Sequence, residues 1–332
     1  MKNRSLRLLS RMSAMLLLAY TLVYLAHAPF RSLPPQPQFE LLAHRGVHQT
    51  FHRRDLRNDT CTAERIDTPR HAYLENTLPS MRAAFDAGAT RIEFDVHATA
   101  DGELVVWHDW TVDCRTEGHG ETRSLTLAQM RALDAGYGYT ADGGKTYPFR
   151  GQGVGLIPSL REVLQAFPEG RFVVNQKDRS RTTTQLIASV LDSVGASDRV
   201  CLAAIAELNA AYLDTTAAAA PRCTLAAPRQ IKRCLIDYLG SGWTGALPAS
   251  CVGQSLTLPD GVLVRLLWGW PGTFIERVRA NGGRVYVWTD DPARVAPLRA
   301  LGIDGILTDR IELMSEAKAP PMEVTMHAPR IR

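Results

Sequence analysis

The chain has 332 residues, of which 45% are hydrophobic and 22% are charged, as in an ordinary packed globular protein. This composition excludes intrinsic disorder, a collagen-like fibre and a polytopic membrane protein for the chain as a whole. The formal net charge is +4, but residues 1–39 hold five basic residues and no acid, which leaves −1 for the remainder. Without a basic domain, no nucleic-acid partner is predicted.

The N-terminus has the pattern of an export signal. Four basic residues precede an apolar run from Met12 to Ala26, so we predict a signal peptide or signal anchor over 1–28 and a proline-rich tether over 29–38. Ala26-His27-Ala28 fits a cleavage site, but Pro29 would follow the cut, which favours a retained anchor. We therefore expect an exported protein, anchored to the membrane on its extracytoplasmic (periplasmic) side, or secreted to the periplasm if the signal is cleaved.

Predicted strands and helices alternate after the tether. Extended segments are predicted at 39–44, 91–96, 103–108, 171–177, 199–204, 222–227, 251–258, 284–290 and 304–309. Helices are predicted at 75–89, 157–167, 181–195, 206–219, 229–240, 273–283 and 292–302.

This alternation over residues 39–314 predicts an α/β fold, a (β/α)8 TIM barrel with an inserted loop at 47–74 after the first strand. A doubly wound open sheet is the main alternative, but the HRGVHQ segment is not the glycine-rich phosphate turn of that fold. The extended segments outnumber the eight staves of a barrel by one, and 251–258 is expected to be the extra segment. Residues 315–332 are expected to form a disordered tail.

The chain has six cysteines, an even number in a protein predicted to leave the cytosol, so disulfides are possible. No Cys-x-x-Cys or Cys/His spacing indicates a zinc site. Six buried free thiols are the alternative.

Polar residues follow the predicted strands at their C-terminal ends, where a barrel of this kind builds its active site. They are His44 and Arg45, Glu93 and Asp95, His108 and Asp109, Asn175 and Lys177, Trp288 to Asp290, and Thr308 and Asp309. One such residue would more often be a loop cap, but six strand ends together indicate a functional site.

The residue types indicate phosphodiester chemistry. Glu93 and Asp95 are two apart in one strand and face the same way, so they would repel each other without a cation. Oxygen donors favour a hard divalent ion, Ca²⁺ or Mg²⁺. Two histidines suit proton transfer near neutral pH, and an arginine with a lysine suits an anionic phosphate.

The segments AHRG, ENTLPSMRAAFDAGATRIEFDVHATADGELVVWHD, VYVWTDD and GIDGILTD occur in this order. In these motifs the chain resembles the glycerophosphodiester phosphodiesterase family from about residue 41 to residue 314. The resemblance implies a barrel that hydrolyses small-molecule glycerophosphodiesters to an alcohol and glycerol 3-phosphate with a divalent cation, Ca²⁺ or Mg²⁺.

The resemblance also implies roles for particular residues. It assigns acid/base catalysis to His44 and His108, metal binding to Glu93 and Asp95, and substrate binding to Arg45, Glu75, Lys177 and Trp288. It leaves open which histidine is the acid, and whether water or the substrate's own glycerol hydroxyl attacks.

The chain departs from the family at Asn175, where a glutamate is usual, so one negative charge is missing. The Asn175 amide oxygen is a candidate metal ligand, with a merely structural role as the alternative. We expect weaker or differently selective metal binding than in a site with a third acid.

The insertion at 47–74 is a second departure, and we expect it to overhang the site as a lid or substrate selector, with a solvated loop as the alternative. A disulfide from Cys61 to Cys114 is predicted to hold it there. His48, His52 and His71 are expected to face solvent, and His97 either lines the pocket or is packed.

Two other functions stay open on the sequence alone. One is phospholipase D-like cleavage of lysophospholipids on the same scaffold, which membrane association through the N-terminal segment would favour. The other is a non-catalytic phosphate-binding barrel that lost activity at Asn175.

Overall fold

The computed structural model describes residues 2–27, 31–36, 38–57, 60–204, 208 and 223–314. The chain divides into two compact units. The larger unit comprises Glu40–Cys223, Asp290–Pro292 and the chain from Leu307 onward. The smaller unit comprises the chain up to Phe39, Thr224–Thr289 and Ala293–Ile306. The predicted helix at 206–219, apart from residue 208, and the predicted tail at 315–332 lie outside the described residues.

The strands of the larger unit are β1 (Glu40–His44), β2 (Arg91–Ala98), β3 (Leu104–Val106), β4 (Phe172–Gln176) and β5 (Val200–Ala204). β1 and β4 flank β2 and run parallel to it, and β5 continues the sheet parallel to β4. The register sets His44 opposite Glu93 and Asp95 opposite Asn175. Residues far apart in sequence are thus brought to one end of the sheet.

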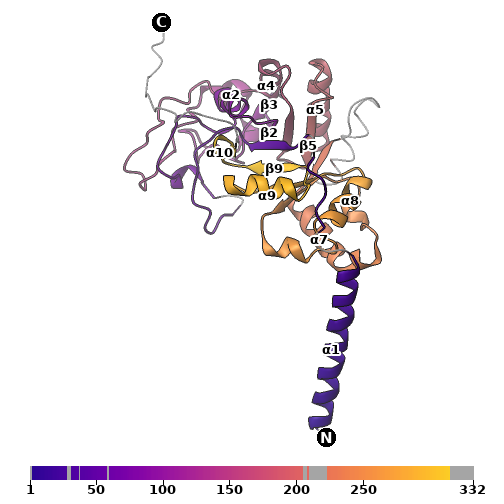
Figure 1. The fold of residues 1–332 in the computed structure, drawn as a ribbon. Helices are drawn as coiled ribbons and strands as arrows, with labels where there is room; N and C mark the ends of the chain where they lie inside the picture. The colour runs from indigo at the N-terminus through magenta and orange to yellow at the C-terminus, as the bar shows by residue number, and fades with distance from the viewer. Residues whose placement is uncertain are drawn as a thin grey trace. The chain divides into compact units, whose positions relative to one another are not determined.

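The helices of the larger unit are α2 (Leu78–Asp86), α3 (Leu127–Ala132), α4 (Leu160–Ala166), α5 (Arg181–Ser193) and α10 (Ile311–Met314). The side chains of Thr77, Thr126, Ser159 and Ser180 cap the first four, because each accepts a hydrogen bond from a backbone N–H in the first turn. In Figure 1 helices α2, α4 and α5 lie on one side of strands β2 and β5.

The smaller unit contains α1 (Lys2–Ala26), β6 (Thr224–Ala226), α7 (Pro228–Ser241), β7 (Leu256–Pro259), α8 (Gly272–Ala280), β8 (Val285–Trp288) and α9 (Val295–Ala300). β7 and β8 pair in parallel, and Leu225 of β6 bridges to Ser255 beside β7. The last strand, β9 (Gly305–Thr308), begins in the smaller unit and ends in the larger one.

The expectation that 251–258 supplies the extra extended segment is wrong. β7 within it pairs in parallel with β8, whereas β3 runs antiparallel to β2 and is therefore not a stave. The reason is the turn between β2 and β3, where Gly102 has a φ of +76°, which a residue with a Cβ atom rarely adopts. This turn folds β3 directly back on β2 as a hairpin.

The N-terminal helix α1 carries exposed apolar side chains, among them Leu16 and Leu17. None of the described helices is long and apolar enough to cross a membrane. Beyond the helix, part of the predicted tether runs along its own unit, since Gly272 N donates to Arg31 O at 2.7 Å and Leu33 N to Leu301 O at 3.3 Å.

The insertion at 47–74 is packed in part, although its residues 52–57 are exposed. Ala63, Ile66 and Leu74 are buried in a cluster with Val105 and Trp107 on the chain after β2. The predicted disulfide between Cys61 and Cys114 is confirmed and joins the same two segments. The remaining cysteines pair as Cys201–Cys223 and Cys234–Cys251.

Candidate active site

The site begins where β1 ends, in the His44-Arg45-Gly46 turn. Arg45 has a φ of +61°, an unusual backbone conformation for a residue with a side chain. A Cβ atom on Gly46 would lie 2.5 Å from Ser80 Oγ, so only glycine fits against α2. The backbone of Arg45 is fixed by two hydrogen bonds, Arg45 N to Glu93 O at 2.7 Å and Asn76 N to Arg45 O at 3.0 Å. The turn therefore holds the Arg45 side chain over the carboxylates of β2.

Glu93 and Asp95 on β2 are both buried, as expected for alternate residues that face the same side of a strand. Asp95 is surrounded by positive groups, with Lys177 Nζ at 3.4 Å and Arg45 Nε at 3.3 Å. Burial alone would raise the pKa of Asp95, but the charges of Lys177, His108 and Arg45 hold it well below its ordinary value. Burial and the neighbouring Asp95 raise the pKa of Glu93.

His44 is held by a carboxylate from the other end of the chain. Its Nδ1 lies 2.5 Å from Asp309 Oδ1, just after β9, and its Nε2 faces Glu93 Oε2 at 3.7 Å. Asp309 also pairs with Arg53 of the insertion, which reaches Asp290 at 3.0 Å as well. The insertion thus contributes directly to the surroundings of His44.

His108 is held by a second carboxylate. Its Nδ1 lies 2.6 Å from Asp109 Oδ1, and Arg115 Nε donates to the other oxygen of Asp109 at 2.8 Å. Arg115 is 2% exposed and also lies 3.3 Å from Glu75 Oε2, while Glu75 Oε1 accepts from Arg45 Nη1 at 2.9 Å. A continuous chain of ion pairs therefore links the support of His108 to that of Arg45.

Both histidines are neutral at neutral pH in this structure. Burial and the charge of Arg45 lower the pKa of His44 to about 3 and that of His108 to about 4. The side-chain carboxylates of Asp309 and Asp109 accept from Nδ1–H, which leaves Nε2 as the atom that exchanges protons. Two imidazoles, each oriented by a carboxylate, suit acid/base catalysis.

The other predicted residues are placed as follows. Asn175 Nδ2 donates to Asp95 Oδ1 at 3.0 Å, beside the acid pair, so its role as a metal ligand stays a prediction. Glu75 pairs with Arg45 and Arg115, and its role in substrate binding stays a prediction. Trp288 ends β8 in the smaller unit, and its role in the pocket wall stays a prediction.

The expectation that His48 faces solvent is wrong. It is 2% exposed, its Nε2 lies 3.3 Å from Asp309 Oδ1, and its Nδ1 lies 2.9 Å from Gln49 O. Gln49 is itself buried and donates to the backbone oxygens of His71 and Tyr73, so the insertion folds inward here. His52 is exposed, as expected, and His71 is half-buried.

Sequence reasoning gave no role to Asp309, Asp109, Arg115 or Arg53. The sequence marked Asp109 and Asp309 as polar residues at the ends of predicted strands, but it did not show that they bind the two histidines. No sequence signal assigns Arg53, because its partners Asp290 and Asp309 lie far away along the chain. Arg115 lies only six residues from Asp109, but its other partners, Thr62 and Glu75, are far away in sequence.

The carboxylates of β2 fit a divalent cation. Glu93 Oε2 is buried without a hydrogen-bond partner in the described part of the chain, beside a second buried carboxylate. Such an atom is costly unless a cation or proton compensates it. His44, His48 and Asp309 also bring possible ligand atoms within 4.8 Å of one another. Arg53 already neutralises Asp309 there, so the pair Glu93 and Asp95 is the better site for added positive charge.

The sequence profile of the Glycerophosphoryl diester phosphodiesterase family matches residues 44–313, most of the chain. The chain belongs to this family. A glycerophosphodiester phosphodiesterase of Caldanaerobacter subterraneus subsp. tengcongensis is 41% identical over 106 residues, 32% of this chain and 40% of that protein. A probable glycerophosphodiester phosphodiesterase 2 of Mycobacterium tuberculosis is 26% identical over 73% of this chain and 84% of its own length. The relatives with 40% identity or more are matched over only 19% to 40% of their own length.

Solved structures of the glycerophosphodiester phosphodiesterase family confirm the predicted fold. A domain of this name from Mycobacterium tuberculosis superposes with a TM-score of 0.60 at 20% identity, over 83% of this chain and 97% of its own. A glycerophosphodiester phosphodiesterase from Agrobacterium tumefaciens gives 0.57 at 21% identity, over 83% and 98%. The chain is a (β/α)8 TIM barrel, as the alternating strands and helices predicted.

Proposed function

We propose that the protein hydrolyses glycerophosphodiesters to an alcohol and glycerol 3-phosphate in a metal-dependent reaction. The observation that carries the proposal is the pair of carboxylate-oriented histidines beside a buried acid pair, in a chain that belongs to this family. Arg45 and Lys177 supply the fixed positive charge that an anionic phosphodiester requires.

A divalent ion would be held by Glu93 and Asp95, with Asn175 as a further candidate ligand, and would draw negative charge from a non-bridging phosphate oxygen. Arg45 and Lys177, both within 3.4 Å of Asp95, bind the phosphate from the same side. These fixed charges would attract the phosphate oxygens and so hold the phosphate group within reach of the two histidines.

His44 is the proposed base. Its Nδ1 proton is bound by Asp309, so its Nε2 carries a lone pair, which accepts from Arg45 Nε at 3.2 Å. It takes the proton of the attacking oxygen as that oxygen bonds to phosphorus. Asp309 stabilises the positive imidazole that results.

His108 is the proposed acid. It protonates the alcohol oxygen as the bond from that oxygen to phosphorus breaks. Binding of the anionic phosphate raises the pKa of an adjacent imidazole, which allows His108 to carry this proton. Over the whole reaction one water molecule is consumed, and the alcohol and glycerol 3-phosphate are released.

The test is hydrolysis by the purified full chain with glycerophosphocholine, glycerophosphoethanolamine and lysophosphatidylcholine, with and without EDTA. His44→Ala and His108→Ala should each lower kcat by about 10²- to 10⁴-fold, while His119→Ala, a histidine with an 87% exposed side chain in the same unit, should not. Faster cleavage of lysophosphatidylcholine would favour the phospholipase D-like alternative. Phosphate binding without turnover of any diester would favour the non-catalytic one.

We also propose that the N-terminal segment exports the chain and keeps it at the extracytoplasmic face of the membrane. The basic start and the exposed apolar side chains of α1 support this. Fractionation should recover the full chain with membranes and a variant lacking residues 2–27 in the soluble fraction. Recovery of the full chain in the soluble fraction with an intact N-terminus would contradict retention.

A further inference from the structure

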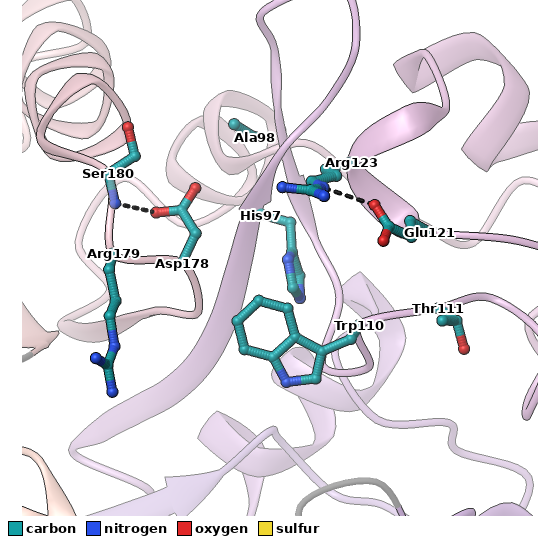
Figure 2. A pocket seen from close by; sticks show the side chains of 9 residues that line it. All are labelled: His97, Ala98, Trp110, Thr111, Glu121, Arg123, Asp178, Arg179 and Ser180. Carbon is teal, nitrogen blue, oxygen red and sulfur yellow. Dashed lines mark hydrogen bonds and ion pairs between the residues drawn. The ribbon is translucent and has the colours of Figure 1, made fainter.

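A cavity of about 560 Å³ opens in the larger unit beside the catalytic residues. It is lined by residues that directly follow the catalytic segments and by the chain around 121–123, as Figure 2 shows. The lining residues are His97, Ala98, Trp110, Thr111, Glu121, Arg123, Asp178, Arg179 and Ser180. None of the residues assigned above to catalysis or to the metal belongs to this lining.

Three segments of the chain contribute residues both to the cavity and to the proposed reaction centre. His97 is the next residue after Asp95 on the same face of β2, about 7 Å further along the strand. Its Nε2 lies 3.4 Å from the backbone oxygen of His108, the proposed acid. Asp178 follows Lys177, whose backbone N donates to Val96 O at 3.1 Å. The cavity therefore begins where the phosphate-binding groups end, on the side of the histidine that protonates the departing alcohol.

The cavity offers an aromatic face. Trp110 is 50% exposed, an unusual state for a tryptophan, and its ring meets His97 edge-on with the ring centroids 5.3 Å apart. In Figure 2 the Trp110 ring and the His97 ring lie together in the middle of the view. An exposed indole attracts a cation through its ring electrons.

The cavity also offers the carboxylate of Asp178, which forms no ion pair with any residue in the described part of the chain. Asp178 accepts hydrogen bonds from Gln176 Nε2 at 2.8 Å, Ser180 N at 3.1 Å and Thr183 Oγ1 at 2.7 Å, all from neutral donors. Arg179 is exposed and extends away from the Asp178 carboxylate in Figure 2.

The second arginine of the cavity does not change this balance. Arg123 Nε donates to Glu121 Oε2 at 2.6 Å, so these two charges cancel. With the charge of Arg179 the lining is neutral overall, and Trp110 and Asp178, which follow the segments of His108 and Lys177, supply its aromatic face and its carboxylate.

We propose that this cavity binds the alcohol part of the substrate and selects an alcohol that carries an ammonium group, with Trp110 and Asp178 as the specificity-determining residues. The inference rests on the proposed diesterase function. An ammonium group two carbons beyond the phosphate, as in a choline or ethanolamine ester, would reach the side of the cavity formed by His97. A bulky neutral polyol would gain neither the aromatic nor the ionic contact.

The experiment compares kcat/KM of the full chain for glycerophosphocholine, glycerophosphoethanolamine and glycerophosphoinositol. The chain should prefer the two cationic substrates over the neutral polyol by about tenfold or more, since the polyol lacks both the aromatic and the ionic contact. Asp178→Asn keeps the shape of the side chain and should reduce this preference several-fold. Trp110→Leu should do the same, whereas Trp110→Phe, which retains an aromatic face, should restore most of it.

Asp86→Asn removes an exposed carboxylate at the end of α2 and is the matched control, which should leave the preference unchanged. Equal kcat/KM for all three substrates, or a preference that Asp178→Asn and Trp110→Leu do not alter, would overturn the head-group inference alone. Failure to hydrolyse any of the three would overturn the diesterase function on which it rests. A preference for the polyol would show that the cavity recognises hydroxyl groups instead.

Discussion

At the scale of single residues, the two histidines proposed as catalysts, His44 and His108, each bind a carboxylate, and the two carboxylates lie at very different distances along the chain. Asp109 is the next residue after His108, whereas Asp309 is separated from His44 by 265 residues and lies 2.5 Å from its Nδ1. A carboxylate that accepts from Nδ1–H fixes the ring and its tautomer, which leaves Nε2 as the atom that would exchange protons in the proposed reaction.

Asp309→Asn is therefore expected to lower kcat by about 10²- to 10⁴-fold with little change in KM, because the amide can stabilise neither the correct tautomer nor the imidazolium. Steady-state kinetics with a glycerophosphodiester measures the effect. Asp86→Asn, at an exposed carboxylate at the end of α2, is the control and should leave kcat unchanged. A kcat of Asp309→Asn within threefold of the unchanged chain would refute this role.

Asn175 is a second residue whose contact in the site leads to a prediction. Its amide nitrogen donates to Asp95 Oδ1 at 3.0 Å, next to the acid pair that is proposed to hold the cation. Asn175→Asp adds one negative charge there, so it should tighten binding of Ca²⁺ or Mg²⁺ by about tenfold in calorimetry. Without metal the same variant should be less stable, because three acids then repel. Tight binding that Asn175→Asp does not improve would contradict the expectation, and Asn281→Asp at an exposed asparagine is the control.

At the scale of elements, the insertion and the loop after β3 act as one support for His108. The Cys61–Cys114 disulfide joins them, and the two residues that follow its cysteines meet, with Arg115 Nη2 donating to Thr62 Oγ1 at 2.7 Å. Arg115 Nη1 also donates to Tyr139 OH at 2.7 Å. Thr62, Tyr139 and Glu75 therefore hold the guanidinium that donates to Asp109.

Replacing both cysteines, Cys61→Ser with Cys114→Ser, should lower stability and activity together. The disulfide closes a loop with a sequence separation of 53 residues, which corresponds to about 4 kcal/mol of chain entropy. Freed from Thr62, Arg115 should hold Asp109 less well, and kcat should fall several-fold at a temperature where the protein is still folded.

The matched control is Cys234→Ser with Cys251→Ser, a disulfide with a sequence separation of 17 residues in the smaller unit. It should cost about 3 kcal/mol in denaturant unfolding with kcat unchanged. If both double variants lower kcat equally, the first disulfide has no special connection to His108.

At the scale of the whole molecule, the stability of the folded protein in acid depends on buried ion pairs beside the proposed catalytic residues. Burial by itself would raise the pKa of Glu75, but the charges of Arg115 and Arg45 lower it to about 2. A carboxylate with a depressed folded-state pKa stabilises the protein above its unfolded pKa, near 4.5, and this contribution is lost as the pH falls towards 2.

Glu75→Gln should therefore be less stable than the unchanged chain by about 3 kcal/mol at pH 6, and the difference should shrink as the pH falls from 4.5 towards 2. Chemical denaturation at a series of pH values measures it. A difference that is constant across this range would show that the lost charge is not the cause. Glu103→Gln, at an exposed residue of the same unit, should show no such pH dependence.

The sequence by itself determined the alternating order of elements, the strand-end residues and the family. Alternation of β and α segments depends on local hydrophobic periodicity and caps such as Thr77 and Ser159, which are readable without a fold. The disulfide between Cys61 and Cys114 also followed from the sequence, because both lie on loops at the same end of a predicted barrel.

Only the tertiary structure decided which strand was surplus and which residues support the catalytic histidines. The Asp101-Gly102 turn is a local signal that β3 folds back on β2, but which segments pair into the parallel sheet depends on long-range contacts. The burial of His48, the roles of Arg53 and Asp309, and the contact of Arg115 with Thr62 likewise arise from partners far away in sequence. Periodicity records which face of an element is apolar, but the pairing of charges depends on where the folded chain brings them together.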